Sequence, residues 1–98
     1  MFEQQEAKST RAIVTVLGAD KIGIIAAVTT ILSNHRVNIL DISQTIMQEF
    51  FTMIMVCDLV HCQVDFAALS DQLEAKGREI GLQVRIQHED VFSFMHRI

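Results

Sequence analysis

The sequence predicts an α+β fold, a four-stranded antiparallel sheet with two helices on one face. Two observations support this prediction. Stretches in which apolar and polar residues alternate, a pattern typical of strands, are interrupted by two stretches with the 3.6-residue period of helices. Along the chain these stretches follow the order β-α-β-β-α-β. We also expect a short helix at the C-terminus.

A loop bracketed by glycines joins the first strand to the first helix. The strand, Ala12–Leu17, is short and rich in β-branched residues. Gly18–Gly23 is predicted as the loop, and the helix runs from Ile24 to the region Asn34–Arg36, where cationic residues suit the C-terminal dipole. Its apolar face comprises Ile24, Ala27, Val28, Ile31 and His35, with Ile25 and Leu32 at the margin.

The next two strands are predicted to form a hairpin around a polar turn at Gln48–Glu49. In Val37–Met47 the alternation places Leu40, Ile42 and Ile46 on one side of the strand. The strand after the turn carries a row of apolar residues on one face, namely Phe51, Met53, Met55, Cys57 and Leu59. A single apolar row predicts a sheet that helices cover on one face only.

Asp65 is the predicted N-cap of the second helix. The apolar stripe of this helix comprises Phe66, Leu69, Leu73 and Ile80, and its end is loosened by Gly77 and Gly81. The last strand, Leu82–His88, alternates throughout, with Leu82, Val84 and Ile86 facing inward. The expected C-terminal helix has an apolar face of Val91, Phe94, Met95 and Ile98.

The element order predicts the ferredoxin-like βαββαβ sandwich. We expect residues 1–10 to form a flexible N-terminal tail and residues 11–98 to form a single domain. The sheet face without helices is half polar. Our hypothesis is that the C-terminal helix covers this face near Ile13, Ile54 and Val56, in its own subunit or in a neighbouring one.

Composition excludes several classes of protein. Half of the 98 residues are hydrophobic, which is too many for a disordered chain. Eight basic and twelve acidic residues give a formal net charge of -4, so we expect no nucleic-acid partner. No stretch reaches the roughly 18 apolar residues of a membrane span, and the N-terminus has no secretory pattern. We therefore expect a cytoplasmic protein whose Cys57 and Cys62 are reduced thiols.

The loop Gly18–Gly23 is the predicted binding site. Its glycines allow a ligand to approach the backbone closely, and the loop leads to the unpaired N–H groups at the start of a helix, which favour an anion. Asp20 could accept a ligand ammonium group. The structural alternative is that both glycines serve the turn and Asp20 caps the helix.

The sequence lacks the residues that other functions of this topology require. The loop contains no cysteine for copper, and the spacing of Cys57, His61 and Cys62 matches no standard zinc motif, so Cys57 is interpreted as a core residue. The first strand has no aromatic residue on which RNA bases could stack. Between Arg11 and Arg36 there is no arginine for a phosphate-binding acylphosphatase loop. We expect no enzyme activity, no metal and no cofactor.

Four strings of residues carry a resemblance to a known family. Val16–Ala26 and Val37–Ile39 resemble the ACT domain, a regulatory module for small ligands. Asn38–Ile46 and Glu49–Met53 are similar to the small stand-alone ACT-domain proteins of bacteria and archaea, and to the ACT domains of formyltetrahydrofolate deformylase and of the glycine cleavage system transcriptional repressor. The resemblance runs from Arg11 to the C-terminus.

The resemblance implies a ligand at a subunit interface, between the loop of one subunit and the start of the second strand of another. The implied ligand-binding residues are Gly18, Ala19, Asp20, Lys21, Ile22, Gly23 and Asn38. Asp20 stands where some serine-binding members carry an amide, and the Asn38 amide could bind the ligand's carboxylate or amine. Many ACT loops read Asp-x-Pro-Gly, whereas Ile22 stands at the proline position, so this loop is less preorganised.

We therefore interpret the chain as a homo-oligomeric ACT protein, a homodimer in the simplest case. It would bind a small molecule such as an amino acid and act as a sensor in trans on a separate protein partner. The alternative is an oligomerisation or protein-interaction module without a ligand.

Overall fold

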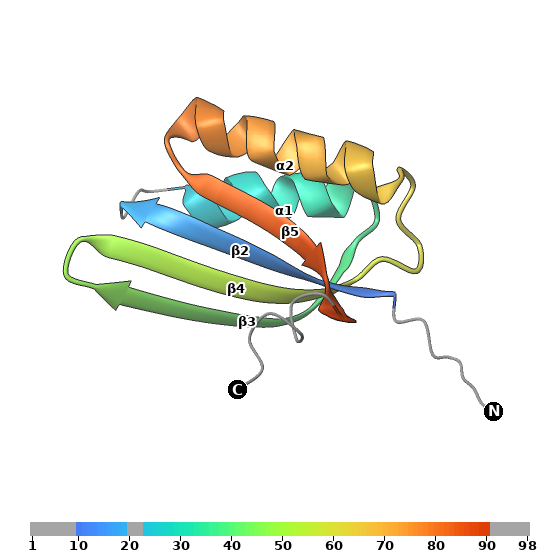
Figure 1. The fold of residues 1–98 in the computed structure, drawn as a ribbon, viewed down its shortest axis with the longest axis horizontal. Helices are drawn as coiled ribbons and strands as arrows, with labels where there is room; N and C mark the ends of the chain where they lie inside the picture. The colour runs from blue at the N-terminus through green and yellow to red at the C-terminus, as the bar shows by residue number, and fades with distance from the viewer. Residues whose placement is uncertain (1–9, 20–22, 91–98) are drawn as a thin grey trace.

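The structure is a computed structural model that describes residues 10–19 and 23–90. Its elements are β2 (Arg11–Ala19), α1 (Ile24–Asn34), β3 (Asn38–Met47), β4 (Phe50–Asp58), α2 (Phe66–Ile80) and β5 (Gln83–His88). The sheet is antiparallel, in the order β3-β4-β2-β5, and both helices cover one of its faces (Figure 1). The predicted βαββαβ fold is confirmed. The N-terminal segment 1–9 and the expected helix over 91–98 lie outside the described residues.

The core lies between the sheet and the two helices. On β4 every second residue is buried, as the apolar row predicts, and the two central strands contribute most of the sheet's share of the core. The fully buried large side chains are Leu32, Met53, Met55, Leu69, Leu73, Val14, Val16, Val28 and Cys57. The sequence places Leu32 at the margin of its helix face, but it is fully buried. The reason is that the helix turns Ile24, Val28 and Leu32 toward the sheet as one row, four residues apart.

Each helix ends in a left-handed residue. After α1, Arg36 has φ 62°, and the amides of Arg36 and Val37 donate to the carbonyls of Ser33 and Leu32 at 3.0 and 2.9 Å. This is a Schellman motif, in which glycine is the usual left-handed residue. After α2, Gly81 has φ 78°. The predicted N-cap of α2 is confirmed, because the Asp65 Oδ1 accepts a hydrogen bond from the Ala68 amide at 2.7 Å.

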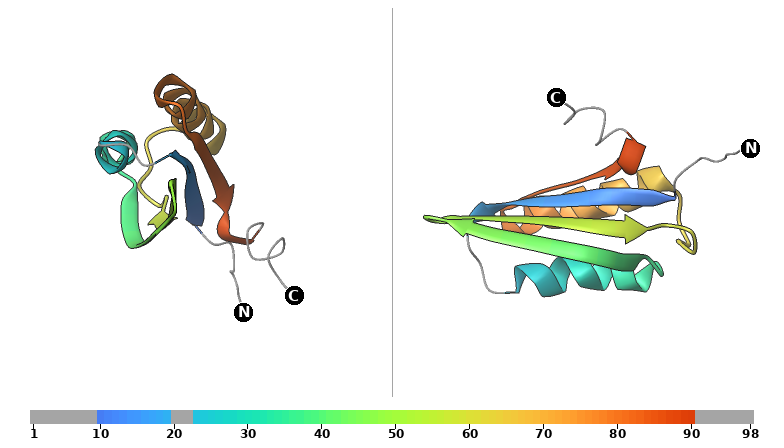
Figure 2. Two further views of the ribbon diagram at one scale, coloured as in Figure 1. Left: turned by 90° about the vertical axis from the view of Figure 1, so that its left-hand side faces the viewer. Right: turned by 90° about the horizontal axis from the view of Figure 1, so that it is seen from below.

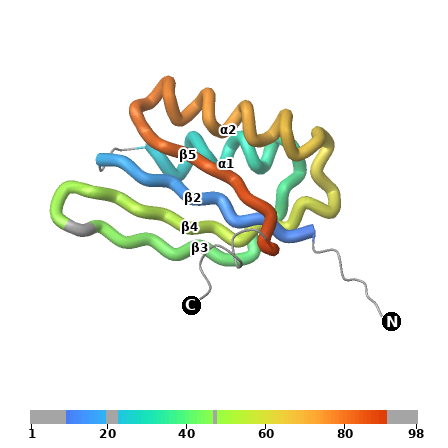
Figure 3. The backbone as a smooth tube through the Cα atoms, in the orientation of Figure 1, coloured from blue at the N-terminus to red at the C-terminus, as the bar shows by residue number. Residues whose placement is uncertain are grey.

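The hairpin of β3 and β4 is confirmed, but the predicted faces of β3 require a correction. Figure 3 shows the chain turning directly from β3 into β4. Ile39 lies opposite Cys57 and Ile42 lies opposite Met55, with a register shift between them at Leu40. Residues opposite each other in an antiparallel pair share a face, so Ile39 and Ile42 are both on the helix side. Leu40 is the extra residue of a β-bulge, which simple alternation cannot predict.

The two helices divide the covered face. Figure 2 shows α1 on the β3 side of the sheet and α2 on the β5 side. Gly77 of α2 lies so close to β5 that a Cβ there would be 2.9 Å from both the Leu82 carbonyl oxygen and the Val84 Cγ2. The side chains of β3 from residue 40 to 46 are exposed. None of the described helices is long and apolar enough to cross a membrane.

Cys57 is predicted to resist alkylation. Its side chain is buried in the core cluster, and burial raises the pKa of its thiol to about 11. The thiolate is the reactive form, so at pH 8 iodoacetamide should modify the partly exposed Cys62 and leave Cys57 unmodified, as mass spectrometry of tryptic peptides would show. In 8 M urea both should react. Equal labelling of both cysteines in the folded protein would contradict the buried position.

Candidate functional site

The predicted binding loop is shorter in the structure than in the sequence-based prediction. Gly18 and Ala19 belong to β2, where they pair with Phe51 and Phe50 of β4. The ladder continues to this point because β4 is long enough to supply partners up to its first residue. Asp20, Lys21 and Ile22 lie outside the described residues. Gly23 precedes α1 as its N-cap, with φ 87°.

The two glycines of the predicted loop have different roles. A Cβ on Gly18 would lie 2.3 Å from the Leu82 Cδ2, at the far end of that side chain, so Leu82 would have to shift to make room for it. This favours the structural interpretation of Gly18. A Cβ on Gly23 would meet no atom within 4 Å, so only its positive φ calls for glycine.

A hollow lies beside the N-terminus of α1, which we call the apolar hollow. It has a volume of about 500 Å³ and is lined by Gly23, Ile24, Ile25, Ala26, Gln44, Ile46 and Phe51. The first hydrogen bond within α1 runs from the Ala27 amide to the Gly23 carbonyl, at 2.9 Å. The preceding N–H groups have no partner in the helix, so they give this hollow a partial positive charge.

A second hollow, which we call the polar hollow, lies where α1 ends and β3 begins. It has a volume of about 670 Å³ and is lined by Thr29, Thr30, Ser33, Asn34, Arg36, Val37, Asn38, Ile39 and His61. The lining contains a guanidinium group and no carboxylate. Within the described ranges, neither Arg36 nor Asn38 has a side-chain hydrogen bond or ion pair. These groups are available to bind a ligand.

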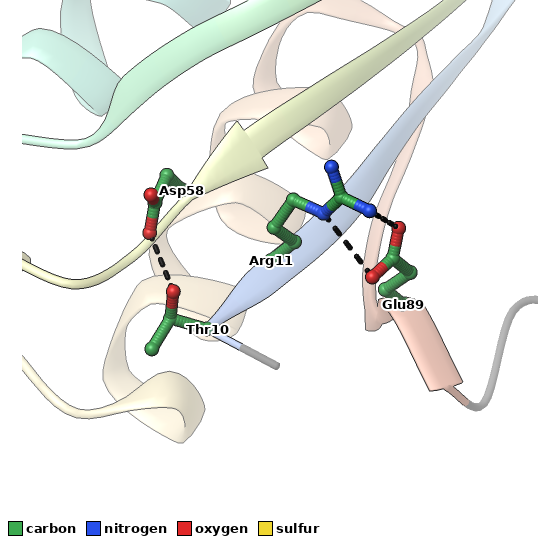
Figure 4. A network of polar contacts seen from close by, with 4 residues as sticks. All are labelled: Thr10, Arg11, Asp58 and Glu89. Carbon is green, nitrogen blue, oxygen red and sulfur yellow. Dashed lines mark hydrogen bonds and ion pairs between the residues drawn. The ribbon is translucent and has the colours of Figure 1, made fainter. Parts of the chain in front are cut away.

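Hydrogen bonds to Asp58 hold the end of the sheet at which β3 starts (Figure 4). Asp58 pairs with Asn38 in the ladder, and its Oδ1 accepts from the Thr10 hydroxyl at 2.7 Å and from the Val60 amide at 3.0 Å. These two hydrogen bonds lower the pKa of the Asp58 carboxyl, with smaller contributions from the charges of His61 and Arg11. Asp58 is therefore a carboxylate at neutral pH, and its bonds fix the surroundings of Asn38.

On the same edge of the molecule, Arg11 pairs with Glu89 through two contacts. The Arg11 Nη2 lies 2.6 Å from the Glu89 Oε2, and its Nε donates to the Oε1 at 3.2 Å (Figure 4). The pair joins the start of β2 to the residue that follows β5. Both side chains are partly exposed, so the pair is expected to orient this end of the sheet more than to stabilise it.

Ala19 and Asn38, two of the predicted site residues that the structure describes, do not meet within one chain. Asn38 is opposite Asp58 and Ala19 is opposite Phe50, so they occupy opposite ends of β4. Eight residues of strand separate the two ends, which corresponds to roughly 27 Å. A small ligand cannot contact both, so Asn38 and the loop can share a ligand only if they come from different subunits.

No metal centre is found among the described residues. They contain no group of three or more His, Cys, Asp or Glu side chains that could hold a metal ion. Cys57 is a core residue, as the sequence predicts.

Sequence reasoning missed Arg36 and His61 as neighbours of Asn38. Only the Schellman turn and the end of β4 bring them to the same hollow. The only sequence signal was their polarity: Arg36 stands two residues before Asn38, and His61 follows the second strand of the hairpin.

Comparisons with known proteins identify the fold. The family model of the ACT domain matches residues 10–87. A UPF0237 protein of Methanosarcina acetivorans is 51% identical over 90 residues, covering 92% of this chain and 98% of that relative. A UPF0237 protein of Methanocaldococcus jannaschii is 51% identical over 89 residues, covering 91% of this chain and 99% of that relative. An ACT domain protein from Streptococcus pneumoniae superposes with a TM-score of 0.75 at 38% identity, covering 87% of this chain and 96% of that one.

Two more distant structures share the fold. A formyltetrahydrofolate deformylase of Burkholderia mallei gives a TM-score of 0.71 at 18% identity, covering 81% of this chain and 28% of the enzyme. A glycine cleavage system transcriptional repressor gives a TM-score of 0.65 at 19% identity, covering 79% of this chain and 44% of that one. The fold is thus that of a generic small-molecule-binding regulatory domain. The chain belongs to the ACT domain family and, within it, to the UPF0237 proteins.

Gly18→Ala is predicted to lower the free energy of unfolding by about 1 kcal/mol or less, because the Leu82 side chain has to change its rotamer to make room for the new Cβ. Urea denaturation would measure this. Repeating the substitution in a Leu82→Ala background provides the control, since the overlapping atom is then absent and the cost should largely disappear. An equal cost in both backgrounds would show that contact with Leu82 is not the reason for glycine.

Proposed function

We propose that this chain is an amino-acid sensor that works as a homodimer and passes its signal in trans to a separate protein. The observation that supports this most directly is the separation of the two hollows along β3. Each hollow offers only part of a binding site, and the two parts are at opposite ends of an unpaired edge strand.

The edge of β3 is suited to pairing with a second copy of itself. The strand has ten residues, of which only Asp41 is charged, and none is proline. Three apolar side chains, Leu40, Ile42 and Ile46, are 46%, 39% and 58% exposed. A long edge strand with a single charge and no proline to block it is a template for adding another strand. We therefore favour pairing of two β3 strands over stacking of the half-polar free faces.

Antiparallel pairing of the two edges would complete the binding site. A two-fold axis near the middle of β3 would place Asn38 of one subunit beside Met47 of the other, at the end of the strand where the apolar hollow lies. The polar hollow of one subunit would then adjoin the apolar hollow of its partner. Two equivalent sites would form, each with residues from both subunits, as expected of an isologous dimer.

An amino acid matches the groups that would meet there. The N–H groups at the start of α1 and the guanidinium of Arg36 are both suited to a carboxylate. The Asn38 amide offers a donor and an acceptor, and Asp20, in the loop before α1, would accept an ammonium group.

The signal would arise because ligand binding and subunit pairing are thermodynamically linked. A ligand held between two subunits binds the paired state more tightly than the separate chains, so it shifts the equilibrium toward that pairing. The role is regulatory and not catalytic. It is supported by relatives matched over 98–99% of their length, in which the match leaves no room for a catalytic domain. In this proposal the output would pass to a separate protein partner.

The proposed dimer predicts that charge on β3 separates the subunits. Ile42→Lys would place two lysines close together across the two-fold axis, and light scattering after size-exclusion chromatography should then show a monomer where the parent chain is a dimer. Val60→Lys is the control, because Val60 is similarly exposed but lies outside β3. A parent chain that remains monomeric, or an Ile42→Lys chain that remains dimeric, would contradict pairing through β3.

Isothermal titration with the twenty amino acids tests the sensor role. We expect at least one to bind with measurable heat. Asp20→Ala and Asn38→Ala should each weaken that binding about tenfold, which corresponds to the loss of a hydrogen bond of roughly 1–2 kcal/mol. If no amino acid binds and the dimer persists, the chain is a ligand-free interaction module instead.

A further inference from the structure

The two hollows beside β3 differ in chemistry, and the difference indicates how a ligand would lie between them. The polar hollow is lined mostly by hydroxyl and amide side chains and contains the cation Arg36 without any acidic residue. The described lining of the apolar hollow consists mostly of aliphatic and aromatic side chains and includes no charged one. In the proposed dimer these two surfaces would face each other across one site.

Arg36 occupies an unfavourable backbone position for an arginine. Its φ of 62° is in the left-handed region, where the Schellman motif at the end of α1 normally has glycine. Within the described part of the chain, no carboxylate forms an ion pair with it. The backbone therefore places this cation, which has no ion-pair partner among the described residues, in the wall of the polar hollow, next to Asn38.

We infer that the ligand is an amino acid with an aliphatic or aromatic side chain, whose carboxylate pairs with Arg36 of one subunit while its side chain fills the apolar hollow of the other. This inference rests on the proposed function, and it adds the ligand class and the residue that selects it.

The carboxylate goes to Arg36 because a guanidinium carries a full charge and binds both carboxylate oxygens through parallel N–H donors. The N-terminus of α1 offers only about half a charge. The apolar hollow, about 500 Å³ in volume, has room for a side chain the size of leucine. A polar side chain would lose water there and gain few partners from Ile25 and Ile46. The site therefore favours leucine over glycine or serine.

Arg36→Asn tests the carboxylate contact. Asparagine tolerates the left-handed conformation better than arginine does, so urea denaturation should show a chain as stable as the parent or more stable. Calorimetry with L-leucine should show at least tenfold weaker binding, whereas L-leucinamide, which lacks the carboxylate, should bind both chains equally weakly. Arg85→Asn is the matched control: Arg85 is an exposed arginine on β5, at the opposite edge of the sheet, and leucine binding should not change.

Ile25→Thr tests the side-chain contact. Ile25 is partly exposed on α1 and lines the apolar hollow. The added hydroxyl should lower the ratio of leucine to glycine affinity at least fivefold, and Val60→Thr, a control outside both hollows, should leave the ratio unchanged.

The outcomes separate this inference from the proposed function. If serine or another polar amino acid binds and leucine does not, or if Arg36→Asn binds leucine as the parent does, the inference is wrong while the sensor role stands. If none of the twenty amino acids binds, both are wrong.

Discussion

The structure depends on the burial of one face of β4 and its neighbours under two helices. Alternate residues of β4 enter the core, and β2 and β5 continue the same layer, so the apolar row of one strand sets the position of everything packed on it. A sheet with one covered face needs strict alternation, because a one-residue slip would turn the row toward solvent. The chain satisfies this condition along β4 without interruption.

The two helices cover the sheet to different extents. On the β5 side, α2 packs closely because Gly77 brings its backbone against the strand, and Gly18 gives Leu82 the room it needs. On the β3 side, α1 leaves both ends of the edge strand open, and these openings are the two hollows. The exposed apolar residues of β3 lie between them. The least covered part of the described fold is thus also the part to which we assign the proposed ligand.

The proposed dimer would give this ACT domain a way to regulate through ligand binding. A binding site divided between subunits makes occupancy and assembly one equilibrium, so a small molecule changes the state of the protein without any bond being made or broken. The bulge at Leu40 keeps Ile39 and Ile42 on the helix side, in line with the hollows. Arg36 places a cation at one end of the proposed site only, so a bound amino acid would have one preferred orientation there.

The sequence by itself determined the order of elements, the covered face of the sheet and the cap of α2, because alternation, helical period and capping chemistry are local properties. It also pointed to both Gly23 and Asn38. Tertiary structure decided what depends on register and on distant contacts. It assigned Gly18 to packing against Leu82, 64 positions further along the chain, and revealed the bulge in β3. It also brought Arg36 and His61 to Asn38 and separated Asn38 from the loop by the length of a strand, because the pairing of β4 with both neighbours fixes where each end lies.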